Sequence, residues 1–178
     1  MLIERSAPAA TDPVDTAALF AFVRVEDQQL QAEASRIALA AAAELEKYAQ
    51  LALFDQTIRV TLDCWPRSAV FALPVAPLID ALSVTITVAG QPFDAFAITV
   101  GLRPAVRCTG DKPSGEVVIT YAAGFGVAPA DLPHDLRLAI MDQVAIAFDL
   151  RGTADGKTNG MGAQAARIAA RYRRVAVG

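Results

Sequence analysis

The side chains with the clearest chemical character stand in the last sixteen residues of the chain. Residues 163–178 contain four arginines and one tyrosine and no acidic residue. A basic segment with an aromatic anchor can dock into an acidic or grooved partner. Nucleic acid is a second kind of partner, and a solvated, frayed chain end is a third interpretation. The candidate residues are Arg167, Arg171, Tyr172, Arg173 and Arg174.

The stretch before this basic segment is rich in Gly, Asp, Asn and Thr. Residues 152–162 read GTADGKTNGMG, a composition typical of a flexible linker. A flexible joint would let a short helix over about 163–175 dock away from its own domain. The sequence therefore predicts a tethered C-terminal docking tail, residues 163–178.

Residue sets that support catalysis or metal binding are missing from this pattern. The only histidine, His134, has no second histidine or cysteine at ligand spacing. Residues 156–158 read Gly-Lys-Thr, but Arg151 stands where a phosphate-binding loop needs its first glycine. Cys64 and Cys108 match no metal or redox spacing and read as free thiols. We expect no enzyme activity, no cofactor and no metal.

Composition excludes further classes of function. The chain has 178 residues, a formal net charge of −3 and 54% hydrophobic residues. An acidic average argues against a general nucleic-acid binder. Glu4 and Arg5 precede any long apolar run, which is unlike a signal peptide. We expect no membrane span, because no stretch approaches about 18 uninterrupted apolar residues.

Two helical regions are predicted to carry these side chains. The first covers residues 16–51, with Asp15 or Thr16 as the N-cap and an interruption at 24–27. Its longer part has apolar residues at spacings of three and four, from Leu30 to Tyr48, which is one helical face. The second covers residues 133–151. Residues 1–14 contain two prolines and small residues, and we expect an arm without regular structure.

The region between the helices, about residues 54–122, is predicted to be β. Residues 57–63 alternate polar and apolar, and 82–88 alternate again. Several short strands joined by tight turns indicate an antiparallel sheet or a small sandwich. The strand that starts at Val117 ends in a joint before the late helix. Its hinge candidates are Gly124, Gly126 and Pro133, because Gly permits a sharp redirection and Pro suits a first helical turn.

The predicted fold class is therefore α+β. A helical core, formed by the long helix of the N-terminal half and the late helix, holds an inserted antiparallel β region and a C-terminal basic helical tail. The predicted divisions are a flexible arm (1–14), a main folded domain (15–151), a flexible linker (152–162) and a docking tail (163–178).

Short motifs follow one another in a defined order from about residue 20 to the end of the chain. They are residues 23–26 (VRVE), 44–48 (ELEKY), 56–57 (QT), 63–67 (DCWPR), 73–78 (LPVAPL), 83–84 (SV), 121–126 (YAAGFG), 132–133 (LP) and 172–174 (YRR). In this order they resemble the head–tail connector (adaptor) proteins of long-tailed phages, including versions carried by gene transfer agents. Arg171 stands where the pattern of that family has a proline.

The resemblance implies a structural ring, commonly of twelve copies, beneath the portal protein. Such a ring extends the channel for double-stranded DNA, without sequence-specific binding, and offers a platform to the next tail-completion protein, the stopper. It also implies assembly in the bacterial cytoplasm and a final place at the head–tail junction. By the same resemblance, the five candidate residues of the tail would face the portal.

Two alternatives stay open. One is a different ring component of the same apparatus, such as a stopper or tail-terminator. The other is an enzyme or small-ligand module that uses the β region as a pocket, with Trp65 and Arg67 as lining residues, although a Trp beside a Pro more often packs as a lid on the core.

Overall fold

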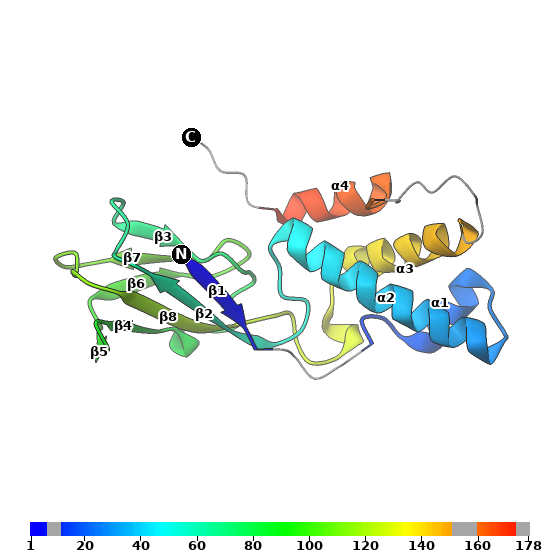
Figure 1. Ribbon diagram of the computed structural model, residues 1–178, viewed down its shortest axis with the longest axis horizontal. Coiled ribbons are helices and arrows are strands. Elements are labelled where there is room, and N and C mark those ends of the chain that lie inside the picture. Colours follow the sequence, from blue (N-terminus) through cyan, green and yellow to red (C-terminus); the bar gives the residue numbers. More distant parts are fainter. Residues whose placement is uncertain (7–11, 151–159, 174–178) are drawn as a thin grey trace. The chain divides into compact units, whose positions relative to one another are not determined.

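The computed structural model describes residues 1–6, 12–150 and 160–173, and the chain divides into two compact units. Unit 1 combines Met1–Ala9 with Phe54–Phe125 and is built from strands, whereas unit 2 combines Ala10–Leu53 with Gly126–Gly178 and is built from helices (Figure 1). The predicted α+β class, with an antiparallel β region inserted into a helical domain, is confirmed.

Four helices make up the described part of unit 2. Asp15 Oδ1 accepts a hydrogen bond from Ala18 N at 2.7 Å, and Asp27 Oδ1 accepts one from Gln29 N at 2.8 Å, so each carboxylate caps the helix that follows it. Arg24 ends the first helix with φ of 54°, a left-handed conformation that separates it from the second. The helices are α1 (Thr16–Val23), α2 (Gln28–Ala49), α3 (His134–Asp149) and α4 (Ala163–Tyr172).

Alanine is the most frequent buried residue in the described part of unit 2. The buried positions of α2 recur at spacings of one, three and four, and most are alanine. Because alanine lets backbones approach closely, α3 packs against α1, α2 and α4. Leu30 and Tyr48, which the sequence places on the buried face, are exposed. The buried residues of α2 are Ala34, Ala38, Ala41, Ala42, Leu45 and Ala49.

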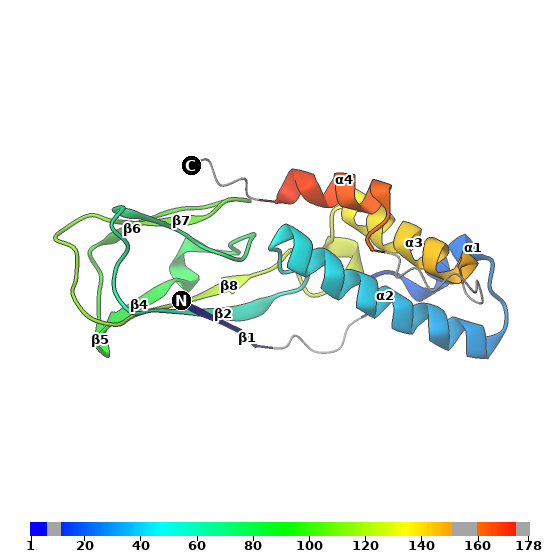
Figure 2. The ribbon, with the colours of Figure 1, turned by 45° about the horizontal axis from the view of Figure 1, so that its top comes forward.

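Unit 1 contains two antiparallel sheets that form two layers (Figure 2). The larger has the strand order β1-β2-β8-β4-β5 and the smaller β3-β7-β6. The strands are β1 (Leu2–Arg5), β2 (Gln56–Leu62), β3 (Val70–Ala72), β4 (Thr85–Val88), β5 (Gln91–Pro92), β6 (Phe96–Thr99), β7 (Ala105–Cys108) and β8 (Val117–Ala123).

The core of unit 1 follows from the alternation of β2 and β8. Every second residue of each strand is buried, including Ile58, Val60 and Ile119. Tyr121 is also buried, and its hydroxyl accepts from Val75 N at 3.0 Å and donates to Val75 O at 3.1 Å. Burial raises the pKa of the Tyr121 phenol well above its usual range, so the group stays neutral.

Two predictions about unit 1 are wrong. Leu2–Arg5 are not an irregular arm but the edge strand β1, which pairs with β2 in the register Leu2↔Thr61 to Arg5↔Ile58. Four residues carry too little pattern to reveal a strand whose partner lies more than fifty positions away. In the expected strand 82–88, Ala81–Ser83 instead form a 3₁₀ turn, because Asp80 Oδ1 accepts from Leu82 N at 3.0 Å.

The linker predicted at 152–162 lies mostly outside the described residues, which resume at Gly160. None of the helices in the described ranges is long and apolar enough to cross a membrane.

Candidate functional site

The C-terminal basic helix is part of the packing of unit 2. α4 buries Ala165, Ile168 and Ala169, and it lies beside α2 and α3 in both ribbon views (Figures 1 and 2). At its start, Gly162 N donates to Gln143 Oε1 at 2.7 Å, which satisfies a side chain that is itself buried. A Cβ on Gly162 would lie 2.6 Å from Ile146 Cδ1, the end of a side chain that can rotate away, so space alone does not require glycine here.

The C-terminal end of α4 is held by a hydrogen bond and a cation–π contact, each of which involves a tyrosine. The Tyr172 hydroxyl donates to Asp135 Oδ1 at 2.7 Å, which ties the last turn of α4 to the first turn of α3. Partial burial, and then the hydrogen bond to Asp135 and its charge, raise the pKa of Tyr172 to about 12. The Arg173 guanidinium lies 5.3 Å from the centroid of the Tyr48 ring, a cation–π contact that contributes about 0.5–1 kcal/mol at an exposed site.

These contacts correct the expectation that the C-terminal helix is free to dock away from its own domain. They also separate the predicted tail residues that the structure describes into an exposed group and a group that holds the helix in place. α4 does not extend away from its own domain, because its apolar side and both ends contact α2 and α3. Arg167 and Arg171 are exposed and four residues apart, so they share one face of the helix. Tyr172 and Arg173 instead hold the helix in place, and Arg174 lies outside the described residues. We call the exposed pair Arg167 and Arg171 the basic face of α4.

The three hinge candidates stand where the chain passes from unit 1 to unit 2. Gly124 is the last but one residue of unit 1, and an added Cβ there would lie 2.6 Å from Asp55 Cα. Gly126 begins unit 2, where an added Cβ would lie 2.6 Å from Asp131 Cγ. Pro133 is the N-cap residue of α3. The glycines thus allow close approach of the Asp55 backbone and of the Asp131 side chain, and a hinge at this point stays a prediction.

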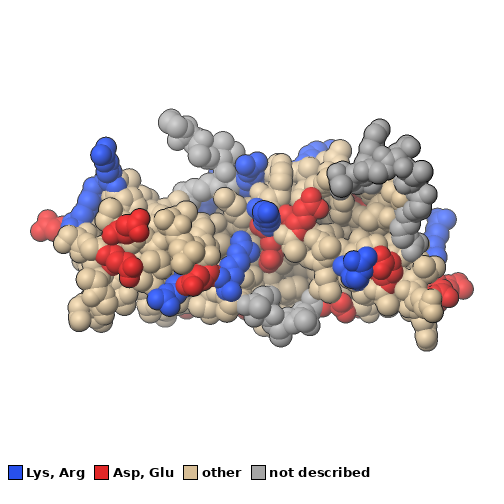
Figure 3. All heavy atoms as spheres, viewed as in Figure 1, with Lys and Arg blue, Asp and Glu red and all other residues tan. Residues whose placement is uncertain are grey.

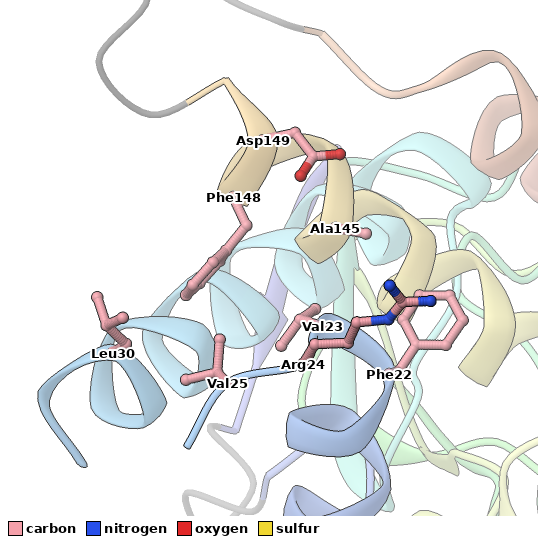
Figure 4. Close-up of a pocket in the computed structure, with 8 residues that line it drawn as sticks. All are labelled: Phe22, Val23, Arg24, Val25, Leu30, Ala145, Phe148 and Asp149. Carbon is pink, nitrogen blue, oxygen red and sulfur yellow. The ribbon is translucent and has the colours of Figure 1, made fainter. Parts of the chain in front are cut away.

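Sequence reasoning missed a pocket of mixed polarity among α1, α2 and α3. It has a volume of about 590 Å³. Figure 4 shows its lining, to which Phe22, Leu30 and Phe148 contribute one large apolar side chain from each helix. Arg24 and Asp149 are its charged members. The one feature that could have pointed to this pocket is that Phe22 and Leu30 are apolar but exposed. Their exposure is not visible in the sequence, from which an apolar residue on a helix is assigned to the core.

The residues considered for catalysis or metal binding are dispersed. Within the described ranges, no three His, Cys, Asp or Glu side chains gather in a group that could hold a metal ion. His134 Nδ1 accepts from Arg137 Nη2 at 2.7 Å in the first turn of α3. Trp65 is buried, and its ring lies 6.0 Å from the Phe93 ring, so it packs in the core instead of lining a pocket.

Comparison with solved structures finds the same fold in gene transfer agent particles. A chain in the virion of a native particle aligns with a TM-score of 0.79 at 22% identity, with 99% of this chain and 97% of that chain covered. Two chains from particle necks also align over 99% of this chain and 97% of their own length. The chain from the neck of an empty particle, computed with C6 symmetry, has a TM-score of 0.78 at 24% identity. The chain from the neck of a native particle, computed with C12 symmetry, has a TM-score of 0.69 at 25% identity.

No protein-family profile and no curated protein matches the chain. The likeness to solved structures therefore carries the comparison, and it covers both units and α4. The resemblance expected from the sequence is confirmed: the chain shares its fold with components of gene transfer agent particles, including chains of the particle neck.

Proposed function

We propose that this chain is a structural component of the neck of a phage or gene transfer agent particle, an adaptor that joins the portal to the tail. The observation that carries the proposal is the fold shared with neck chains over 99% of the sequence. The likeness includes the β unit, the helical unit and α4, so it extends over both units of the chain.

The proposed adaptor acts as a ring, with twelve copies as the expected number. In a cyclic assembly neighbours meet head to tail, so each copy needs two different side surfaces. A strand-built unit and a helix-built unit provide surfaces of different kinds. The twelvefold symmetry of the native neck that contains a similar chain is consistent with this number.

The ring would extend the channel for double-stranded DNA and offer a platform to the stopper. A conduit should not hold DNA, because a lining of Lys and Arg would bind the phosphate backbone. The net charge of −3 agrees with that requirement. On the face drawn in Figure 3, acidic and basic side chains are interspersed and form no broad basic surface.

The basic face of α4 is the proposed contact with the portal. Arg167 and Arg171 point away from α2 and α3 and can pair with carboxylates of a partner. Tyr172 and Arg173 contribute indirectly, because they hold α4 in a fixed orientation. Fixing the helix before binding lowers the entropy lost on docking. Arg174 is included in the proposed contact from its sequence position alone.

Sedimentation velocity of the chain mixed with purified portal rings tests this proposal. We expect many copies to co-sediment with each portal, and we expect the double variant Arg167→Glu with Arg171→Glu to lose this binding. The matched control is Arg103→Glu with Arg107→Glu, which changes the charge equally at exposed positions of unit 1 and should bind normally.

The outcomes separate the alternatives. Equal binding by both double variants would exclude the basic face as the portal contact while keeping the adaptor. If the chain ignores the portal but binds another connector protein, it is a stopper or tail-terminator instead. A rise in melting temperature with a common cofactor, and no binding to neck proteins, would favour a small-ligand module.

A further inference from the structure

The N-terminal strand β1 contributes no buried residue to the core of its unit. All four of its residues are exposed, and Leu2 and Ile3 keep 57% and 39% of their surface in solvent. The strand is held by its ladder to β2 and by Ser6, whose N donates to Thr57 O at 2.9 Å. Glu4 and Arg59 form an open ion pair at 3.8 Å. Side-chain packing therefore does little to distinguish the chain's own β1 from the same strand of another copy at the edge of β2.

β1 also reaches its place by an indirect route along the chain. Residues 1–9 belong to unit 1, but the next residues, Ala10–Leu53, belong to unit 2 before the chain returns at Phe54. β1 is thus joined to its own sheet only through the other unit.

The outer edge of β2 nevertheless needs a strand paired with it. β2 is the second strand of the larger sheet, and without β1 its outer backbone N–H and C=O groups would form an open edge. Every copy of the chain presents the same edge and carries the same strand. The β1 of any copy can therefore pair with the β2 of any other copy in the same register and with the same hydrogen bonds.

We propose that, in the assembled ring, residues 1–6 of each chain pair with β2 of the neighbouring copy. The inference rests on the proposed ring, because it needs copies held side by side. Exchange makes and breaks the same hydrogen bonds, and a neighbour held nearby supplies a high effective concentration of the strand. Passed head to tail around a closed ring, the strands leave no edge unfilled.

The exchange gives the ring a link that side-surface contacts alone do not provide. Each copy would hold the next through a main-chain ladder, the mode by which an extended segment adds to a sheet edge. The exposed Leu2 and Ile3 would then lie at a junction between copies, where a neighbouring surface can cover them.

Chains that each carry one introduced cysteine, beside the buried native Cys108, test the proposal directly. One chain carries Glu4→Cys and a second carries Arg59→Cys, both with Cys64→Ser to remove the exposed native thiol. The two side chains are 55% and 58% exposed, so neither change disturbs the core. In an antiparallel ladder, hydrogen-bonded pairs alternate with pairs that are not hydrogen-bonded. Ser6 and Thr57 are hydrogen-bonded, so the pair two positions away, Glu4 and Arg59, is hydrogen-bonded too. The Cα atoms of such a pair are about 5.5 Å apart, a distance that a disulfide can span.

Equal amounts of the two chains are assembled together and oxidised. With exchange, about half of the chains become covalent dimers, because about half of the Glu4→Cys strands meet an Arg59→Cys neighbour in a closed ring. The register control replaces Arg59→Cys with Thr61→Cys, which faces Leu2 instead of Glu4 and should give few dimers. A chain carrying both cysteines should give a ladder of linked copies on a non-reducing gel.

Failure of this inference and failure of the ring are distinguishable. If sedimentation shows a ring but the two-cysteine chain closes only on itself and stays monomeric on the gel, exchange is wrong and the ring stands. If no multimer forms, with or without portal, the ring is wrong and exchange falls with it. Equal dimer yields at Arg59→Cys and Thr61→Cys would show unspecific oxidation and also overturn the proposed register.

Discussion

The cores of the two units differ in their share of alanine. In unit 1, most buried residues are branched or aromatic, such as Ile58, Ile119 and Tyr121. In the described part of unit 2, alanine accounts for nine of the twenty buried apolar residues, against three of eighteen in unit 1, and positions such as Ala38 and Ala169 bring helices close together. A core of large side chains is most sensitive to a loss of volume, whereas an alanine-lined contact is most sensitive to a gain.

The only tryptophan allows the two units to be followed separately. Trp65 lies in unit 1, so its fluorescence reports that unit, while far-UV circular dichroism is dominated by the helices of unit 2. Equilibrium unfolding in urea, recorded by both signals, therefore tests each prediction on the unit that it concerns. Coincident shifts in both signals would show that the units unfold as one.

The largest effect is expected from Ile119→Ala in unit 1. Ile119 is fully buried on β8, so its truncation should lower the free energy of unfolding by about 2–5 kcal/mol, seen in the fluorescence transition. Ile98→Ala, on the edge strand β6 and only partly buried, is the matched control and should cost less. Equal losses would mean that burial does not distinguish the two positions.

A gain of volume should be the sensitive change in unit 2. Ala169→Leu places three extra carbons where α4 meets its neighbours, and we expect a loss of about 1–3 kcal/mol in the circular dichroism transition. Ala170→Leu adds the same atoms at the exposed next position and should be nearly neutral. A similar loss at both positions would contradict close packing of α4.

Removal of one buried hydroxyl should be felt in unit 1. Tyr121→Phe leaves both backbone groups of Val75 without their partner, at a cost of about 1–3 kcal/mol in the fluorescence transition. Tyr48→Phe, at an exposed position of α2, is the control and should change little. A neutral Tyr121→Phe would show that water replaces the hydroxyl.

The smallest effect is a dependence of unit 2 on alkaline pH. The pKa of Tyr172 is raised to about 12 in the folded chain, above the value of about 10 in an unfolded chain. The folded state therefore holds this proton more tightly, and the stabilisation present below pH 10 is lost as pH rises from 10 to 12. Tyr172→Phe should show a shallower decline of the helical signal in that window. If the helical signal of Tyr172→Phe declines as steeply with pH as that of the unchanged chain, ionisation of Tyr172 is not the cause of the decline.

Much of the fold could be predicted because its signals are local. Asp15 and Asp27 lie immediately before the helices that they cap, and the alternation in β2 is contained within seven residues. The end of β8 and the start of α3 were located by two glycines and a proline within ten positions. The same locality explains the failure at Leu2–Arg5, where four residues gave no pattern and the partner strand was distant.

The candidate site was predicted in part. The residue types of the basic helix were evident, and Arg167 and Arg171 do share an exposed face. Its attachment was not evident, because a linker composition says nothing about what the following helix packs against. The pocket among α1, α2 and α3 was also missed, since exposed apolar residues such as Leu30 follow the same period as buried ones.

The sequence by itself determined the order of the helical and β regions, the cap of the first helix, the acidic average charge and the concentration of arginine near the C-terminus. These depend on contacts within a few residues or on composition alone. Only the tertiary structure decided that β1 completes a sheet, that α4 packs on α2 and α3, and that Tyr172 bonds to Asp135, 37 residues away. Contacts at such separations depend on how whole elements pack, and no local pattern of residues specifies that packing.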